Sequence, residues 1–371
     1  MSFRISIVLC LLFFLFLVPA FVFSSGEREV EMDVLFPKAC ADCHSDNPKY
    51  ALAGARLAYD TSGHNTIGNS WYANGAGCQK CHTNEGFIEF VETGKVGEYV
   101  SNPSQPGCFT CHAPHTKGDF SVRTNKPVKL ADGSVVNMGD GNLCANCHQS
   151  RRIAKDTVKA SDAKGISSHF GAHHGPQADI IAGANAFENP ANRYSSSAHK
   201  MVVKDGCVSC HMALKEGRYS ASPALGGHSF GIEAEVHEAG KLNISACASC
   251  HKDIKQVRGK EIFDLKAKAD FDLDGTVEPL QAEVEGLLEG FVNTNGTGYL
   301  QRLNPPMYKA DGSWAGSKTG SWTIEEVAAL YNYKMFLEDR SKGVHNATYT
   351  IQILYDSLKA LDPGLDDSLR P

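Results

Sequence analysis

The sequence has little net charge and no excess of basic residues. Its 36 Lys and Arg against 42 Asp and Glu leave a formal charge of -6 over 371 residues, with 42% hydrophobic residues. So small a charge beside an ordinary apolar fraction argues against an intrinsically disordered chain. An isoelectric point near 6.2 argues against a dedicated nucleic-acid binder, which carries a strongly basic face. We therefore expect a folded protein of one or two domains with no nucleic-acid partner.

Proline is not enriched, at 15 residues, whereas Gly is frequent, at 35 residues, and aromatic residues make up 9%. This composition is typical of a loop-rich protein. We expect that the interior is filled partly by something other than side chains.

Long apolar runs are missing except at the N-terminus, where residues 5–23 are almost continuously apolar between Arg4 and the small residues 24–26. This order is typical of a secretory signal peptide, which we place at 1–26. The alternative is an uncleaved anchor, because about 19 apolar residues come near the minimum needed to span a membrane. We expect an exported protein, in the periplasm or at the cell surface, with no stable transmembrane segment after cleavage. Cys10 leaves with the signal, so 13 - 1 = 12 cysteines remain.

The remaining cysteines form six Cys-x-x-Cys pairs, and a histidine follows each pair directly. This is the attachment motif of c-type haem, in which both thiols bond to one haem and the imidazole of the next residue binds its iron. A redox dithiol or half of a zinc site would not require a histidine after every pair. The pattern predicts six haem c groups, attached at Cys40, Cys43 and His44; Cys78, Cys81 and His82; Cys108, Cys111 and His112; Cys144, Cys147 and His148; Cys207, Cys210 and His211; and Cys247, Cys250 and His251.

Nine histidines lie outside the motifs, enough to fill the second axial position of all six irons. Methionine is the weaker candidate, because only five of the 7 Met lie beyond the N-terminal segment. His64 and His199 lie shortly upstream of a motif. His115 follows His112 by three residues, too near to reach the same iron from the opposite face, so it would serve a neighbouring haem. His228 follows two glycines, which allow the backbone to approach a flat macrocycle.

The group His169, His173 and His174 is ambiguous. On a helix, positions 169 and 173 would share a face and 174 would point elsewhere. We favour His173 as a ligand, with His169 or His174 as substitutes. His237 lies in an acidic stretch and is predicted to be solvated. His345 directly precedes a helical pattern and is a candidate ligand at its first turn.

Between the motifs, Gly, Asn, Ser and Pro are frequent, which predicts loops and turns rather than long elements. We expect a mainly α fold with extensive loops and little β-structure, in which a haem-packed region covers 27–260. Short helices should carry the motifs, and a further helix is predicted over 177–187.

Beyond the sixth motif the cysteines end and the apolar spacing changes. Thr323 and Glu326 have the form of a capping box, and Gly343 suits a helix end. We expect this helical region, 261–371, to pack on the haem region and to deliver His345 to it; the alternative is an independent module. The spacing predicts long helices over 280–292, 322–340 and 347–361.

An acidic stretch in the C-terminal region matches the start of a calcium loop, with Gly275 at the position of the sharp turn. Position 12, where a bidentate Glu is expected, holds Gln281, so Glu283 or Glu285 would have to replace it. The alternative is an acidic turn before a helix. The candidate calcium ligands are Asp270, Asp272, Asp274 and Thr276.

The six motifs, the stretch 168–177 (Ser-His-Phe-Gly-Ala-His-His-Gly-Pro-Gln) and the stretch 343–346 (Gly-Val-His-Asn) resemble the bacterial multihaem c-type cytochromes, especially those related to nitrite reductases and hydroxylamine oxidoreductases. Members of that family usually hold each haem between two histidines and stack the haems into chains that conduct electrons. In the nitrite-reducing members, a Lys commonly replaces the motif histidine at the catalytic haem, whereas all six motifs here end in His. The resemblance implies a hexahaem cytochrome whose distal ligands are His64, His115, His173, His199, His228 and His345.

The favoured function is electron transfer through six bis-His haems, with redox partner proteins or extracellular electron acceptors. Assembly into a homo-oligomer or a conducting filament is a variant of this hypothesis. The alternative is a reductase or oxidase of small nitrogen or sulfur compounds, which requires one open iron with a proton donor such as His169, His174 or His237 beside it. Because no motif lacks its histidine, we favour the electron carrier and assign no catalytic residue.

Overall fold

The computed structural model describes residues 52–66, 73–75, 77–159, 165–215, 222–236, 239–316, 320–366 and 370. The chain divides into two units, Met1–Leu52 and Ala53–Pro371, and the second contains all the described residues except Leu52. The predicted signal peptide at 1–26, the first motif (Cys40, Cys43 and His44) and His237 lie outside the described residues.

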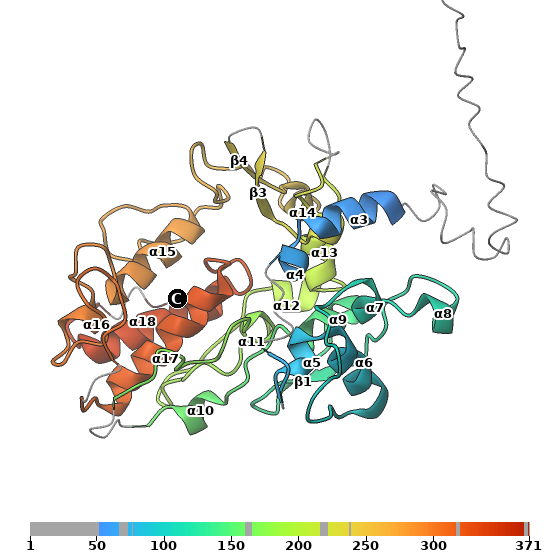
Figure 1. Cartoon of the computed structure of the whole chain (residues 1–371). Coiled ribbons are helices and arrows are strands. Elements are labelled where there is room, and N and C mark those ends of the chain that lie inside the picture. Colours follow the sequence, from blue (N-terminus) through green and yellow to red (C-terminus); the bar gives the residue numbers. More distant parts are fainter. Residues whose placement is uncertain are drawn as a thin grey trace, which may run out of the picture. The chain divides into compact units, whose positions relative to one another are not determined.

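Short helices and loops make up most of the part that carries the haem motifs (Figure 1). Among the described residues, strands form only two small antiparallel hairpins: β1 (Val128–Lys129) with β2 (Val135–Val136), and β3 (Glu233–Val236) with β4 (Ala239–Leu242). The predicted mainly α fold with little β-structure is confirmed. The helices before the C-terminal region are α3 (Leu52–Asp60), α4 (Gly63–Thr66), α5 (Gln79–His82), α6 (Asn84–Thr93), α7 (Cys108–Cys111), α8 (Pro114–Lys117), α9 (Asn142–Ala145), α10 (Ala154–Thr157), α11 (Gln177–Ala182), α12 (His199–Val202), α13 (Cys207–His211) and α14 (Ser245–Ala248), with 3₁₀ turns η1 (Gly139–Gly141) and η3 (Gly227–Ser229).

Longer helices follow in the C-terminal region: α15 (Leu280–Phe291), α16 (Tyr299–Arg302), α17 (Ile324–Asp339) and α18 (Ala347–Leu361). The helix α17 begins at the predicted capping box, in which Thr323 Oγ1 accepts the N–H of Glu326 at 3.2 Å and Glu326 Oε2 accepts the N–H of Thr323 at 2.7 Å. This helix ends earlier than Gly343, because Arg340 adopts a left-handed conformation (φ 61°). Helices α17 and α18 lie side by side (Figure 1).

The predicted helix over 177–187 is too long. Helix α11 ends at Ala182, since Gly183 takes a left-handed conformation (φ 64°) and Asn185 also has a positive φ of 61°. A helix cannot continue through these backbone angles.

The largest hydrophobic core joins the C-terminal helices to the stretch after the fourth motif. Leu330 on α17 and Leu354 on α18 are fully buried, and the same cluster contains Ile180 from α11 and Ala172. Between residues 77 and 127, by contrast, only Phe87 and Ala113 are buried hydrophobic side chains. The stretch that carries the second and third motifs therefore obtains little of its cohesion from apolar side chains of its own.

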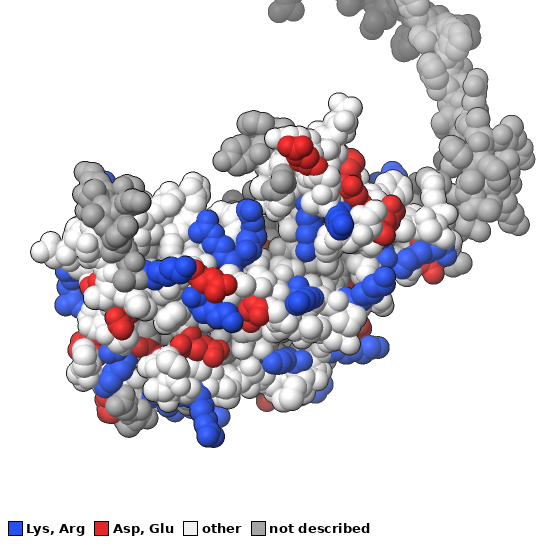
Figure 2. Space-filling model, turned by 90° about the horizontal axis from the view of Figure 1, so that it is seen from below, with Lys and Arg blue, Asp and Glu red and all other residues white. Residues whose placement is uncertain are grey.

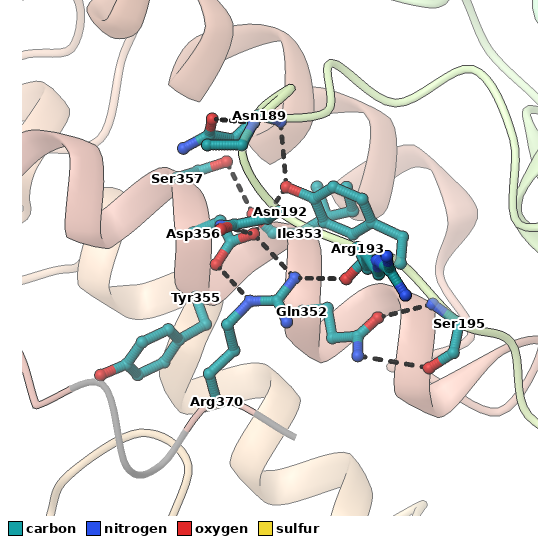
Figure 3. Close-up of polar contacts among 12 residues, drawn as sticks. Asn189, Asn192, Arg193, Ser195, Gln352, Ile353, Tyr355, Asp356, Ser357 and Arg370 are labelled. Atoms are coloured by element: carbon teal, nitrogen blue, oxygen red, sulfur yellow. Dashed lines mark hydrogen bonds and ion pairs between the residues drawn. The ribbon is translucent and has the colours of Figure 1, made fainter.

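A polar network fixes the segment that leads to α12 (Figure 3). Asp356 on α18 accepts hydrogen bonds from Asn192 Nδ2 at 2.8 Å and from the Tyr194 hydroxyl at 2.6 Å, and it pairs with Arg370 Nε at 2.7 Å. Because this carboxylate is mostly buried, its partners offset the cost of desolvating the charge. The C-terminal helices thereby hold the chain just before His199.

Charged residues of both signs are interspersed on the face seen in Figure 2. No helix in the described part of the chain has the length and apolar character needed to cross a membrane.

Candidate functional site

Each described haem motif is built on a single helical turn. In four of them the N–H of the motif histidine donates to the carbonyl of the first cysteine, at 2.9–3.1 Å, and in the fifth the turn is α13 itself. Residues i, i+3 and i+4 of a helical turn lie on one face, so one such turn places the two thiols and the following imidazole on the same side. No disulfide joins any two of the described cysteines.

A second imidazole faces the imidazole of every described motif. Each of these partners belongs to the distal set that the family resemblance implies. The ring centroids are 6.0–6.4 Å apart. The pairs are His82 with His173 (6.4 Å), His112 with His228 (6.1 Å), His148 with His64 (6.0 Å), His211 with His345 (6.2 Å) and His251 with His199 (6.1 Å).

This separation fits one metal ion between two imidazoles. A ligating nitrogen lies about 2 Å from its metal and roughly 1 Å from the centre of its own ring, so two ligands on opposite sides hold their centroids about 6 Å apart. Edge-to-face ring contacts also occur at centroid distances of about 4.5–7 Å, so the argument rests on the recurrence of the same separation at every described motif. The five pairs therefore have the spacing of axial ligands to a haem iron.

Hydrogen bonds at Nδ1 orient several of these rings and leave Nε2 for a metal. His211 Nδ1 lies 2.9 Å from the carbonyl oxygen of Phe230, and His199 Nδ1 lies 2.9 Å from that of Val344. His148 Nδ1 lies 3.2 Å from Gln177 Oε1. Partners of this kind fix the tautomer and the direction of a ligating imidazole.

A carboxylate takes the same place at His345. His345 Nδ1 lies 2.6 Å from Asp339 Oδ1, and both side chains are largely buried. Burial disfavours the imidazolium, but the carboxylate outweighs that effect and raises the pKa of His345. Asp339 closes α17, so the C-terminal helices both deliver this imidazole and orient it.

The loop around His228 depends on its glycines. Gly226 has φ 67°, and a Cβ at this position would lie 2.1 Å from the carbonyl oxygen of Ala213. Only glycine fits a left-handed conformation with so close a backbone neighbour. This places η3, and with it His228, opposite His112.

The structure gives the three histidines of the group at 169–174 different surroundings, which the sequence could not distinguish. The predicted helical face is wrong, since these residues form turns and His173 has φ 77°. His173 faces His82, whereas His174 is exposed and its Nδ1 lies 2.9 Å from Glu338 Oε2. His169 is also exposed.

Two candidate ligands are held as neutral imidazoles. Burial, with a smaller effect of His148, lowers the pKa of His64 to about 4. Burial and the nearby guanidinium of Arg151 lower the pKa of His173 to about 4. A neutral imidazole is the form that binds a metal.

The fourth motif adjoins the second and the fifth. The side chain of Cys147 neighbours that of Cys81, and its Sγ lies 3.8 Å from the carbonyl oxygen of Lys80. The side chain of Cys144 neighbours that of Cys207. Helices α13 and α14, which carry the fifth and sixth motifs, also pack together. The fourth and fifth motifs and the fifth and sixth motifs, each pair consecutive in the sequence, and the second and fourth motifs as well, thus adjoin one another.

The candidate calcium loop brings its acidic residues together. Ligand oxygens of Asp270, Asp272 and Glu283 lie within 4.8 Å of one another, as do those of Asp272, Asp274 and Glu278. Burial raises the pKa of Asp272 to about 6, and the neighbouring carboxylate of Glu283 adds to this shift.

Of the three residues considered for the last ligand position, only Glu283 reaches the loop. Its carboxylate accepts the N–H groups of Phe271 and Glu278, each at 2.7 Å. Gln281 Oε1 instead accepts the N–H of Phe263, and Glu285 pairs with Lys342 at 2.9 Å.

Sequence reasoning missed the residues that orient the ligands. Asp339 and Gln177 lie at a helix end and a helix start, and nothing in their local sequence marks them as partners of an imidazole. Asp339 lies six residues before His345, which is the only signal that could have drawn attention to it.

No protein-family model matches the chain. It is similar to the C-type polyheme cytochromes OmcB and OmcC of Geobacter sulfurreducens, with 21% identity over 88% of this chain and 44% and 43% of the respective relatives. The chain therefore spans less than half the length of these curated relatives.

Two solved structures are also similar. The outer cell wall cytochrome OcwA has a TM-score of 0.45 and 20% identity, covering 82% of this chain and 50% of that protein. An undecaheme cytochrome from the S-layer of Carboxydothermus ferrireducens has a TM-score of 0.37 and 16% identity, covering 84% and 40%. None of these names carries a link to nitrite or hydroxylamine enzymes, so that part of the sequence resemblance stays a prediction.

Proposed function

We propose that this multihaem c-type cytochrome is an exported electron-transfer protein that holds six haem c groups between pairs of histidines. The observation that carries the proposal is the set of five histidine pairs, each a motif histidine facing a second imidazole at 6.0–6.4 Å. Haem c supplies one-electron redox chemistry without binding a substrate when both axial positions are filled. The protein's part is to attach, space and ligate the cofactors.

The sixth pair is assigned by elimination. The other five distal candidates each face a different described motif histidine, and the sixth candidate, His115, lies on α8 and is exposed. We assign it to the haem of His44. His115 could bind this haem within its own chain or in a second chain of an oligomer or filament. The oligomeric state of a His115→Ala variant distinguishes the two cases, because the oligomer would be lost only if His115 ligates a haem of a second chain.

The histidine pairs favour electron transfer over a reductase of small nitrogen or sulfur compounds. A reductase needs one iron with an open side and a proton donor near it. In each described motif, a second imidazole faces the motif histidine, which supports the electron carrier. The two exposed histidines that could have acted as donors, His169 and His174, lie outside the pairs.

Calcium binding belongs to the same proposal as a structural element. Asp270, Asp272, Asp274 and Thr276 would provide oxygen ligands, and Glu283 would take the place of the missing position-12 Glu. A divalent cation would compensate the mutual repulsion of these carboxylates and tie the loop to α15.

The partners are redox proteins or extracellular electron acceptors, and the location is the periplasm or the cell exterior. The motifs and the apolar N-terminal run support this part of the proposal.

The test uses the purified full-length holoprotein after reduction with dithionite. We expect rapid reoxidation by a soluble ferric chelate and no catalytic turnover of nitrite, hydroxylamine or sulfite. A preparation that turns over one of these compounds, or that binds carbon monoxide in its ferrous form, would contradict the assignment.

A further inference from the structure

The histidine pairs differ in what orients them. Five imidazoles of the described pairs have a described Nδ1 partner. In four of them the partner is a neutral oxygen: a backbone carbonyl at His112 (Ser121), His199 (Val344) and His211 (Phe230), and the amide of Gln177 at His148. His345 alone among them faces a carboxylate, that of Asp339, at 2.6 Å.

The carboxylate of Asp339 is in an environment that preserves its effect. The residue is 4% exposed, so solvent screens its charge little. Its other side-chain partner is the hydroxyl of Ser341, which donates to Oδ2. The side-chain hydrogen bonds described for this carboxylate therefore involve one imidazole and one neutral hydroxyl, and no Lys or Arg. Its charge also acts on His211, the other imidazole of the pair.

A carboxylate at Nδ1 changes the electronic character of a ligating imidazole. It draws the Nδ1 proton toward itself and so makes Nε2 a stronger donor to the metal. A nearby negative charge also stabilises the ferric form, which carries one more positive charge than the ferrous form. Both effects lower the reduction potential.

We propose that Asp339 is a potential-setting residue, which makes the haem held by His211 and His345 the lowest-potential member of the chain. This inference rests on the proposed function, because it presumes that these two histidines ligate a haem. It adds that the C-terminal helices tune the redox profile of the haem region as well as supplying one ligand to it.

The test is a spectroelectrochemical titration of holoprotein carrying Asp339→Asn. The amide keeps an oxygen for the imidazole but removes the charge. We expect the lowest-potential component to become at least tenfold easier to reduce at fixed applied potential, which corresponds to about 59 mV for a one-electron couple. The electron paramagnetic resonance signal of one low-spin haem should shift with it, while the haem count stays the same.

Glu338→Gln is the matched control. It removes the same charge one residue earlier, from a side chain that pairs with the exposed His174 rather than with a ligand, and it should leave the lowest-potential component in place. An equal shift in both variants, or no shift in a folded low-spin Asp339→Asn protein, would overturn the inference and leave the electron-transfer assignment intact.

A second variant covers the case in which Asp339→Asn fails to fold. Ser341→Ala removes the hydroxyl that competes for the carboxylate, so Asp339 should accept the imidazole proton more strongly and the same component should become harder to reduce. An unchanged or easier reduction in this variant would contradict the proposed role. High-spin haem in the wild-type protein would instead refute the proposed function itself.

Discussion

Replacing His173 by alanine tests the ligand assignment at its most ambiguous point. His173 faces His82 at 6.4 Å, next to two other histidines. Removal of its imidazole should leave the haem of the second motif with one axial ligand, while the remaining pairs are unchanged. One of six motifs is affected, so about one sixth of the haem should become high-spin, and carbon monoxide binding should rise from none to about one per chain.

The neighbouring histidines provide matched controls. The ring of His174 lies 5.0 Å from that of His173 but is held at the surface by Glu338, 2.9 Å away. His169 is exposed and faces no motif histidine. Alanine at either position should leave a fully low-spin protein that binds no carbon monoxide.

The assay is a carbon monoxide titration of the dithionite-reduced holoprotein, followed in the Soret band, with a pyridine haemochrome count to normalise for haem. The reasoning would be refuted by a His173→Ala protein that stays fully low-spin, or by a high-spin haem that appears on loss of His174 instead. In either case the imidazole closest to His82 would not be its axial partner.

Three other changes test separate parts of the structure. Burial raises the pKa of Asp179 from 3.8 to about 6, so the stability that its protonated form contributes is present below about pH 4 and is lost as the pH rises through 6. The free energy of unfolding of Asp179→Asn, measured with a denaturant, should therefore rise by about 3 kcal/mol relative to that of the wild type between pH 4 and pH 7. An equal difference between the two proteins at both pH values would contradict this. Calcium at about 100 times its dissociation constant should stabilise the wild type by about 2.7 kcal/mol, which would raise its melting temperature above that measured with a chelator. Glu283→Gln should abolish this stabilisation, and Glu285→Gln should retain it. A wild type whose melting temperature is the same with calcium and with a chelator would count against the site. Gly226→Ala should displace His228, because its Cβ would clash with a backbone carbonyl, and should yield one high-spin haem; an unaltered spectrum would show that the loop tolerates the substitution.

Local sequence signals predicted the elements that depend on local interactions. Helix α18 covers 347–361 as predicted, and α17 begins at the predicted capping box. The helix predicted over 177–187 failed at Gly183, where apolar spacing continued but the backbone turned left-handed. Hydrophobic periodicity reports which face is buried and is insensitive to such a turn.

The candidate ligands were predictable as a set but not as pairs. Residue type and motif context single out His64, His173, His199, His228 and His345, and the structure places each opposite a motif histidine. Which motif each one faces depends on long-range packing that no local pattern encodes.

The orienting groups depend on tertiary contacts in the same way. The carboxylate of Asp339 and the amide of Gln177 come into place only when α17 and α11 pack beside the motifs. Their roles could therefore be recognised only from the structure.

The most direct test of the account is the low-temperature electron paramagnetic resonance spectrum of the oxidised full-length holoprotein, recorded on material whose intact mass gives the number of attached haems. The account predicts six haems per chain and only low-spin ferric signals, since every iron has two imidazole ligands. A high-spin signal amounting to one haem or more per chain, or a mass without attached haem, would contradict it.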